Sequence, residues 1–183
     1  MREPAPPYAG EGPNALWHVS EDPTIEIFRP HVAATALEDE ERVWAVDTRH
    51  LPLFWFPRDC PRATFWPSGR TTADDADRFF DGEQKRVHAI ELGWLDRMRS
   101  ATVVAYRMPE ESFRQHPGTG GYWISTEPVE PVELVELGDL LGRHADAGIE
   151  LRLVRSLWPL WDRVTGSTVE FSGIRLHNAA PRG

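Results

Sequence analysis

The sequence is poor in residues that cross-link a chain or gather metal ions. It has one cysteine, Cys60, so a disulfide within the chain and a zinc site built from several thiolates are both excluded. Its seven histidines are scattered, and no two have the i,i+3 or i,i+4 spacing that brings two metal ligands onto one helix face. We therefore predict no metal cofactor.

Several motifs of nucleotide and hydrolase chemistry are absent as well. The sequence contains no GxxxxGKS/T, GxGxxG, HExxH or GxSxG. These absences remove support for a phosphate-binding loop, a dinucleotide-binding βαβ fold, a zinc protease and a hydrolase nucleophile elbow. No apolar run approaches the roughly 20 residues of a membrane span, and the first residues lack the apolar core of a signal peptide. We expect a cytoplasmic protein that does not cross a membrane.

Basic residues are outnumbered by acidic ones. The chain has 20 Lys and Arg against 29 Asp and Glu, which gives a net charge of −9. Nucleic-acid affinity depends on basic side chains that displace counterions from phosphates, so this balance disfavours a nucleic-acid partner. Arg58 with Arg62 is the candidate for a local basic patch.

The chain is large enough for one well-formed core. It has 183 residues, of which 40% are hydrophobic, including 8 Trp and 8 Phe, and a chain of this size buries about 70% of its unfolded surface. The start is rich in Pro and Gly. We therefore predict a flexible leader over residues 1–14 and a single domain over residues 15–183.

Short apolar or alternating runs predict an α+β fold with mixed, mostly antiparallel sheets and short helices, because clean βαβ repeats are few. The predicted strands cover residues 15–20, 42–47, 62–66, 86–92, 102–108, 122–125, 129–137, 149–154 and 169–176. The predicted helices follow Thr48, fall within residues 67–83 and 94–98, and cover residues 139–147 and 157–164. Thr48 is predicted to cap the first helix and Asp139 a later one, which Gly148 closes.

His18 is the most suggestive polar residue. It lies near the end of the first predicted strand, with Ser20 two residues on. An imidazole at the rim of a sheet can bind a ribose hydroxyl or act as a general base near neutral pH. The alternative is a partly buried histidine whose ring is satisfied by the backbone.

The segment from Phe54 to Arg62 (FWFPRDCPR) is dense in unusual residue types. Its aromatics could stack on a nucleobase while Arg58 and Arg62 pair a phosphate. Alternatively, the aromatics belong to the core, and Arg58 with Asp59 closes a tight turn. Cys60 is either a nucleophile activated by a base that is distant in sequence or a small buried apolar residue.

Four long motifs resemble an uncharacterised bacterial domain family. They are Trp17–Pro23 (WHVSEDP), Val43–Asp47 (VWAVD), Trp55–Arg62 (WFPRDCPR) and Leu151–Pro159 (LRLVRSLWP). The resemblance extends over nearly the whole chain from residue 15. It implies family membership, but this family brings no assigned activity with it.

A more distant resemblance links the order of elements to the ADP-ribosyltransferase-like superfamily. A strand with a histidine (Leu16–Ser20), a strand that opens a short helix (Val43–Phe56) and a late strand (Tyr122–Val129) follow one another as in that superfamily. The resemblance implies an ADP-ribosyltransferase-like fold and NAD, or a related nucleotide, as the bound small molecule.

The same resemblance implies roles for individual residues. His18, with Ser20, would bind a ribose, and Trp44 or Phe54 would stack on nicotinamide. A late-strand glutamate should orient the ribose, but Gly121 or Tyr122 stands at the expected place and Glu127 follows the strand. Arg58 and Arg62 would bind the pyrophosphate, and Glu127 is the candidate catalytic carboxylate. One expected function is therefore the transfer of ADP-ribose, with a protein as the acceptor. The alternatives are an inactive nucleotide-binding module and a protein-binding module with an acidic surface.

Overall fold

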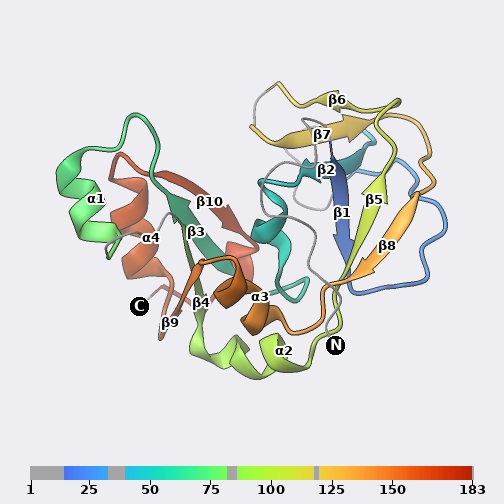
Figure 1. Cartoon of the computed structure of the whole chain (residues 1–183). Helices are drawn as coiled ribbons and strands as arrows, with labels where there is room; N and C mark the ends of the chain where they lie inside the picture. The colour runs from blue at the N-terminus through green and yellow to red at the C-terminus, as the bar shows by residue number, and fades with distance from the viewer. Residues whose placement is uncertain (1–14, 33–39, 82–85, 118–119, 183) are drawn as a thin grey trace. The chain divides into compact units, whose positions relative to one another are not determined.

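The structure is a computed structural model (Figure 1). It describes residues 15–32, 40–81, 86–117 and 120–182. The leader predicted over residues 1–14 lies outside these ranges, as does part of the segment 67–83.

The chain divides into two compact units. Unit 1 comprises Met1–Trp55 and Thr102–Gly138, and unit 2 comprises Phe56–Ala101 and Asp139–Gly183. Each unit therefore consists of two chain segments, and a segment of the other unit lies between them in the sequence. Each has a sheet of its own, and the two sheets differ in topology.

Unit 1 contains a six-stranded sheet with the order β6-β7-β2-β1-β5-β8, in which every neighbouring pair is antiparallel. The strands are β1 (Leu16–Ser20), β2 (Val43–Asp47), β5 (Val104–Met108), β6 (Arg114–Gln115), β7 (Tyr122–Ser125) and β8 (Glu133–Glu136). A single 3-10 turn, η1 (Leu51–Phe54), follows β2 and has Pro52 in its first turn. Proline is favoured there because it has no N–H to leave unpaired.

The strand register assigns the side chains of unit 1 to two faces of the sheet, since paired residues point the same way and successive residues alternate. Leu16 pairs with Asp47 and with Met108, which defines the first face. This core face carries the buried cluster Leu16, Phe28, Val43, Ala45, Val104, Tyr106, Met108, Phe113 and Val129. The opposite face, here the Trp44 face, carries Trp44 and Tyr122.

Unit 2 contains a four-stranded mixed sheet with the order β10-β3-β4-β9. Its strands are β3 (Arg62–Trp66), β4 (Val87–Glu91), β9 (Glu150–Val154) and β10 (Glu170–Ile174). β4 and β9 run parallel, and the other two pairs are antiparallel. The helical segments are α1 (Ala73–Phe79), η2 (Leu92–Trp94), α2 (Leu95–Ser100), α3 (Leu140–Asp146), α4 (Trp158–Thr165) and η3 (Leu176–Asn178).

The core of unit 2 packs α4 and the end of α1 against the sheet. Its buried cluster consists of Ala63, Phe65, Phe79, Phe80, Val87, Ala89, Leu157, Leu160, Val164 and Val169. β4 is buried at all five positions, Val87 to Glu91. A strand with neighbours on both sides and packing on both faces accounts for the continuous burial.

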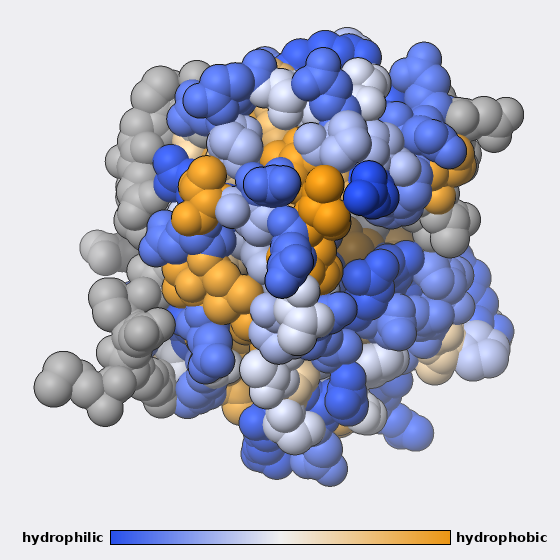
Figure 2. Space-filling model, turned by 90° about the vertical axis from the view of Figure 1, so that its right-hand side faces the viewer, coloured by the Kyte–Doolittle hydropathy of each residue, from blue (hydrophilic) through white to orange (hydrophobic). Residues whose placement is uncertain are grey.

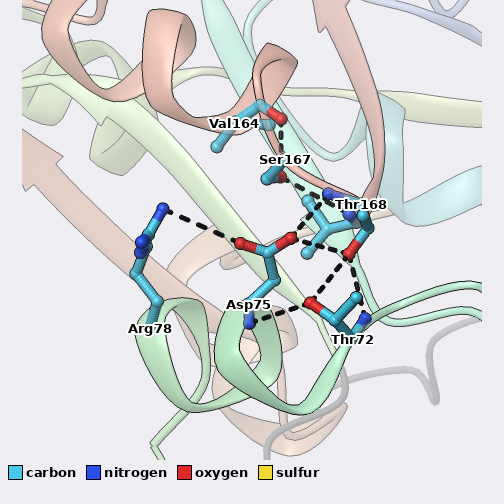
Figure 3. A network of polar contacts seen from close by, with 7 residues as sticks. Thr72, Asp75, Arg78, Val164, Ser167 and Thr168 are labelled. Atoms are coloured by element: carbon cyan, nitrogen blue, oxygen red, sulfur yellow. Dashed lines mark hydrogen bonds and ion pairs between the residues drawn. The ribbon is translucent and has the colours of Figure 1, made fainter.

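A polar network holds the beginning of α1 against the turn that leads into β10 (Figure 3). The Thr72 hydroxyl accepts the Asp75 N–H, at a donor–acceptor distance of 3.3 Å, and so caps the helix. The Asp75 carboxylate accepts both the N–H and the hydroxyl of Thr168, at 2.8 and 2.7 Å. Hydrogen bonds to the carboxylate lower the pKa of Asp75, mainly those from Thr168.

The structure confirms the mixed α and β class with antiparallel and mixed sheets and a few short helices. One expected detail is wrong. Thr48 does not cap the helix after β2; its hydroxyl accepts the indole N–H of Trp17 at 2.9 Å, and η1 has no side-chain cap on its preceding residue, His50. A buried indole N–H needs a partner, and Thr48 provides it.

Candidate functional site

Half-buried rings gather on the Trp44 face of unit 1. His116 stacks against Trp44 with ring centres 5.2 Å apart, and Tyr122 presents its edge to Trp44 at 6.4 Å. Phe54, at the end of η1, meets Tyr122 at 6.2 Å. All four side chains are only partly buried, so part of this aromatic cluster is open to solvent.

Cationic side chains accompany the aromatic cluster. The Arg42 guanidinium lies 5.8 Å from the centre of the Trp44 ring, and Glu40 pairs with Arg42 at 2.6 Å. Arg114 is opposite Ile124, which places it on the Trp44 face. An arginine beside a ring adds a cation–π attraction and a donor for phosphate or carboxylate groups.

A carboxylate–imidazole pair lies at the end of β2 and in the turn that follows it. The Asp47 Oδ1 atom is 2.7 Å from His50 Nδ1 and also accepts the His50 backbone N–H at 2.9 Å. Since a carboxylate only accepts hydrogen bonds, His50 Nδ1 carries the proton of this bond. Burial alone would raise the pKa of Asp47, but the hydrogen bonds and charge of His50 lower it overall.

Gly121 packs directly against this pair. It has a left-handed φ of 78°, and a Cβ atom there would lie 2.0 Å from His50 Nδ1. Its carbonyl accepts the Asp47 N–H at 3.0 Å, and Tyr122 follows it directly. Only glycine combines this backbone conformation with so close an imidazole ring.

His18 belongs to the core face, opposite the Trp44 face, because its paired residue is Tyr106. Its Nδ1–H donates to the Trp44 carbonyl at 2.7 Å, and its ring lies 4.6 Å from Phe28. The backbone pairing of β1 with β2 ends at Trp17 and Val46. The His18 imidazole therefore donates to a carbonyl that lies beyond the backbone pairing of β1 with β2. Because successive side chains of a strand alternate between faces, the His18 and Trp44 side chains lie on opposite faces of the sheet.

The two remaining predicted site residues of unit 1 have partners outside the aromatic cluster. Ser20 is buried, and its hydroxyl accepts the Asp22 N–H at 3.1 Å. Glu127 is exposed in the turn after β7, where its N–H donates to the Ser125 hydroxyl at 3.1 Å.

The predicted arginines belong to unit 2 and differ from each other. Arg62 is buried, donates from Nη1 to the Cys60 carbonyl at 2.9 Å and has its guanidinium 5.2 Å from the Phe56 ring. Arg58 is exposed. Cys60 is fully buried, and burial raises its thiol pKa to about 12, which removes the thiolate needed of a nucleophile at neutral pH.

Unit 2 also buries two histidines that the sequence did not single out. His144 Nδ1–H donates to the Leu140 carbonyl at 2.7 Å, so its Nε2 accepts from His88 Nδ1–H at 3.0 Å. The remaining His88 Nε2 is buried without a hydrogen-bond partner. Burial, followed by the charges of His144, Arg86 and Arg62, holds the pKa of His88 well below its usual value.

Two open grooves occur elsewhere on unit 1. One, of about 390 Å³, is lined by Pro23, Thr24, Ile25, Glu26, Tyr106, Pro131, Val132, Glu133 and Leu134. The other, of about 580 Å³, is lined by Arg107, Met108, Pro109, Glu110, Glu111, Phe113, Trp123 and Val132. Figure 2 views the side on which β8 lies and shows separate apolar patches within a polar surface. Neither groove includes His18 or Trp44, so we place the candidate site at the aromatic cluster.

Within the described ranges, no three His, Cys, Asp or Glu side chains come together as a possible metal-binding group. The helices of those ranges are short, the longest being α4 with eight residues, and none has the length and hydropathy to cross a membrane.

Comparison with known proteins identifies a family for almost the entire chain. The protein belongs to DUF6886, a family of unknown function, whose profile matches residues 17–179. No curated protein and no solved structure matches the chain.

Proposed function

We propose that unit 1 binds a nucleotide, NAD or a related ADP-ribose compound, through the aromatic cluster of Trp44, Phe54, His116 and Tyr122. The observation that carries this proposal is the set of adjoining, half-buried rings on one face of a sheet. An indole and a phenol ring that remain partly exposed offer flat surfaces to a nucleobase or nicotinamide ring. Such stacking contributes about 1–3 kcal/mol per base.

Charge near the cluster supports the same class of ligand. Arg114 is exposed and lies on the same face as Trp44, so its guanidinium is the candidate for the phosphates of a nucleotide. Arg42 lies against the Trp44 ring but is buried and paired with Glu40. This assignment replaces Arg58 and Arg62 as the phosphate-binding candidates, because Arg62 is buried on the Cys60 carbonyl and both belong to unit 2.

His18 takes a supporting role in this proposal. Its hydrogen bond to the Trp44 carbonyl fixes the backbone of the residue whose ring faces the ligand. The ADP-ribosyltransferase-like resemblance gives His18 a ribose contact instead. These two roles differ experimentally: the supporting role predicts that His18→Ala weakens every ring-containing ligand equally, whether or not it has a ribose.

Transfer of ADP-ribose is the reaction implied by the resemblance, and Glu127 is its candidate carboxylate. Its exposed position after β7 leaves binding as the function that the geometry favours. Release of nicotinamide from NAD, abolished in Glu127→Gln, would establish transfer or hydrolysis. Binding of NAD without nicotinamide release would identify a binding module.

The test of the proposed function is calorimetric titration with NAD, ADP-ribose and nicotinamide mononucleotide. These three ligands distinguish an adenine ring from a nicotinamide ring at the cluster. We expect Trp44→Ala and Tyr122→Ala to weaken binding about 10-fold or more, in line with the loss of one stacking contact. The control is Phe171→Ala, which removes an exposed aromatic from β10 of unit 2. Equal affinities in all variants, or no binding by the unaltered protein, would refute the proposal.

A further inference from the structure

Unit 1 has an open sheet edge at β8, the last strand in the order of its sheet. Among the described residues, no strand lies on the outer side of β8. The Leu137 N–H donates to the Val103 carbonyl at 2.8 Å, and Leu134 is opposite Tyr106. Because antiparallel pairs alternate between hydrogen-bonded and non-hydrogen-bonded residues, the backbone N–H and C=O of Leu134 are directed away from β5. An edge of this kind is a template for a further strand.

The first of the two open grooves lies beside Leu134. Its walls are Pro23–Glu26 and Pro131–Leu134, and Tyr106 also lines it. An isolated bridge joins the two walls at one end, where Phe28 and Val129 exchange backbone hydrogen bonds of 2.8 Å. Beyond this bridge the walls separate, and the groove between them gives access to the edge of β8.

Exposed apolar side chains accompany the open edge. Val132 is 67% exposed and Leu134 is 40% exposed. Val132 lines both grooves, and the second groove includes Phe113 and Trp123. Figure 2 faces this side of unit 1 and shows apolar patches within a hydrophilic surface. Apolar surface with a polar rim is typical of a contact with another chain.

Carboxylates dominate the charge of both grooves. Glu26 and Glu133 line the first groove, and Glu110 and Glu111 line the second, where Arg107 is the one cation among the described lining residues. The four glutamates are exposed and form no ion pair with any residue that the structure describes. These like charges repel a second copy of the same edge and attract a basic partner.

We infer that β8 binds an extended, basic segment of another protein, which adds a strand to the sheet beside Leu134. In such a pairing, each partner side chain lies beside one of β8 and on the same face of the sheet. Apolar partner residues cover Val132 and Leu134, and lysine or arginine lies beside Glu133 and Glu136. The partner segment therefore has an apolar–basic–apolar order, with a second basic residue two positions beyond.

This site is separate from the aromatic cluster. β8 is three strands from β2 in the order of the sheet, and neither groove includes Trp44. The inference therefore does not depend on nucleotide binding, and the two can fail independently.

The test uses two fluorescently labelled peptides that differ only in charge. One has the sequence TVKVTKT, and the other has glutamate in place of both lysines. We expect the full chain to bind the lysine peptide within a range up to about 1 mM, more weakly at high salt, and not to bind the glutamate peptide. Fluorescence anisotropy measures both. Equal binding of the two peptides, or no binding of the lysine peptide, would overturn the inference.

A charge reversal locates the bound peptide. Glu133→Lys should weaken binding of the lysine peptide about 10-fold and allow the glutamate peptide to bind. The matched control is Asp77→Lys, which makes the same change of charge at an exposed residue of unit 2 and should leave both affinities unchanged. Equal effects of the two substitutions would show attraction to the net charge alone and would contradict a site at β8.

Hydrogen exchange tests the addition of a strand directly. Exchange of the Leu134 amide should slow about 10-fold when the lysine peptide binds, because this N–H enters a new backbone ladder. Unchanged exchange at Leu134 in the bound state would refute strand addition. Slow exchange at Leu134 without peptide, together with dimerisation that depends on protein concentration, would assign the edge to a second copy and also overturn the inference.

Discussion

Two separate structural constraints require glycine at position 121. Its positive φ and its contact with the His50 ring are separate constraints, and each excludes side chains for its own reason. Gly138 offers a comparison within the same unit, because its φ is 61° and a Cβ atom there would have nothing within 4 Å. The two glycines therefore differ in crowding and not in backbone conformation.

We predict that Gly121→Ala destabilises the protein more than Gly138→Ala does. The left-handed conformation alone costs about 1–2 kcal/mol for a residue with a Cβ, and the contact with His50 adds a displacement of the imidazole. Urea unfolding of both variants measures the difference. Equal losses of stability would mean that the His50 ring moves aside at no cost.

Glu91 is a second residue with two tasks. It is buried at the end of β4, where Oε1 accepts the Leu157 N–H at 3.1 Å and Oε2 accepts the Ala180 N–H at 2.9 Å. It therefore caps the start of α4 from a different element and holds the segment after η3. Neither contact follows from the sequence, because Leu157 is 66 residues from Glu91.

We expect Glu91→Gln to lower the free energy of unfolding by about 2 kcal/mol. The amide can accept one of the two N–H groups but turns its NH₂ toward the other, leaving a buried donor unpaired. Equilibrium denaturation is the measurement. Glu170→Gln is the control, because Glu170 pairs with Arg70 on the surface, where an ion pair contributes about 0–1 kcal/mol. Similar effects of the two substitutions would contradict the buried-cap role.

At the scale of elements, the start of α1 depends on its neighbour. Thr72 and Asp75 have the spacing of a capping box, yet the Asp75 carboxylate binds Thr168 in the turn before β10 (Figure 3). The network thus joins two segments 93 residues apart. Helices as short as the seven residues of α1 are marginal alone and need such tertiary support.

We predict that Asp75→Ala lowers the melting temperature more than Asp74→Ala. Both acids lie in the first turn of α1 and share the favourable interaction with the helix dipole. The difference therefore reports the bonds to Thr168 together with the ion pair of Asp75 and Arg78 at 3.8 Å, and a surface pair of that kind contributes only about 0–1 kcal/mol. Since the Asp75 pKa is lowered in the folded protein, its stabilisation is present at neutral pH and is lost as pH falls through the folded pKa, below 3.8. Differential scanning calorimetry at neutral pH compares the variants, and equal melting temperatures would leave the network without a role in stability.

The elements themselves were largely predictable from local sequence, unlike their pairing. A short apolar run predicted β2, and alternation predicted β4. β6 consists of only Arg114 and Gln115, which is too short for the alternation of apolar and polar residues that predicts a strand. Strand order, and hence the faces on which His18 and Trp44 lie, depends on contacts between distant segments that a single sequence does not encode locally.

The candidate site was predictable only in part for the same reason. Trp44 and Phe54 were identified from the sequence as aromatic candidates, and both belong to the cluster. His116 and Tyr122 join it through the pairing of β7 with β2. The Asp-x-x-His spacing of Asp47 and His50 is the signal that could have indicated the pair, since an aspartate commonly accepts N–H groups of the turn that follows it.

At the scale of the whole molecule, the histidines of the two units differ in how deeply they are buried. The candidate site of unit 1 has partly exposed imidazoles, whereas unit 2 buries His88 and His144 in contact with each other and with Phe56. Burial lowers the pKa of His144 to about 4 and that of His88 well below its usual value. Acid should therefore act on the stability of the protein through unit 2.

We predict that the free energy of unfolding falls as pH decreases from about 6.5 to about 4. In that interval the unfolded chain protonates both histidines, whose ordinary pKa is about 6.5, and the folded chain does not. One such histidine contributes up to about 1.4 kcal/mol per pH unit, so His144 alone accounts for roughly 3 kcal/mol by pH 4, where its contribution stops growing. Urea denaturation at intervals from pH 8 to 4 measures the slope.

The His144→Gln substitution should reduce this slope of stability against pH. The control His177→Gln changes an exposed histidine of the same unit and should leave the slope unchanged. Since the denaturation of a destabilised variant still yields a slope, an unchanged pH dependence in His144→Gln would show that the acid sensitivity has another origin.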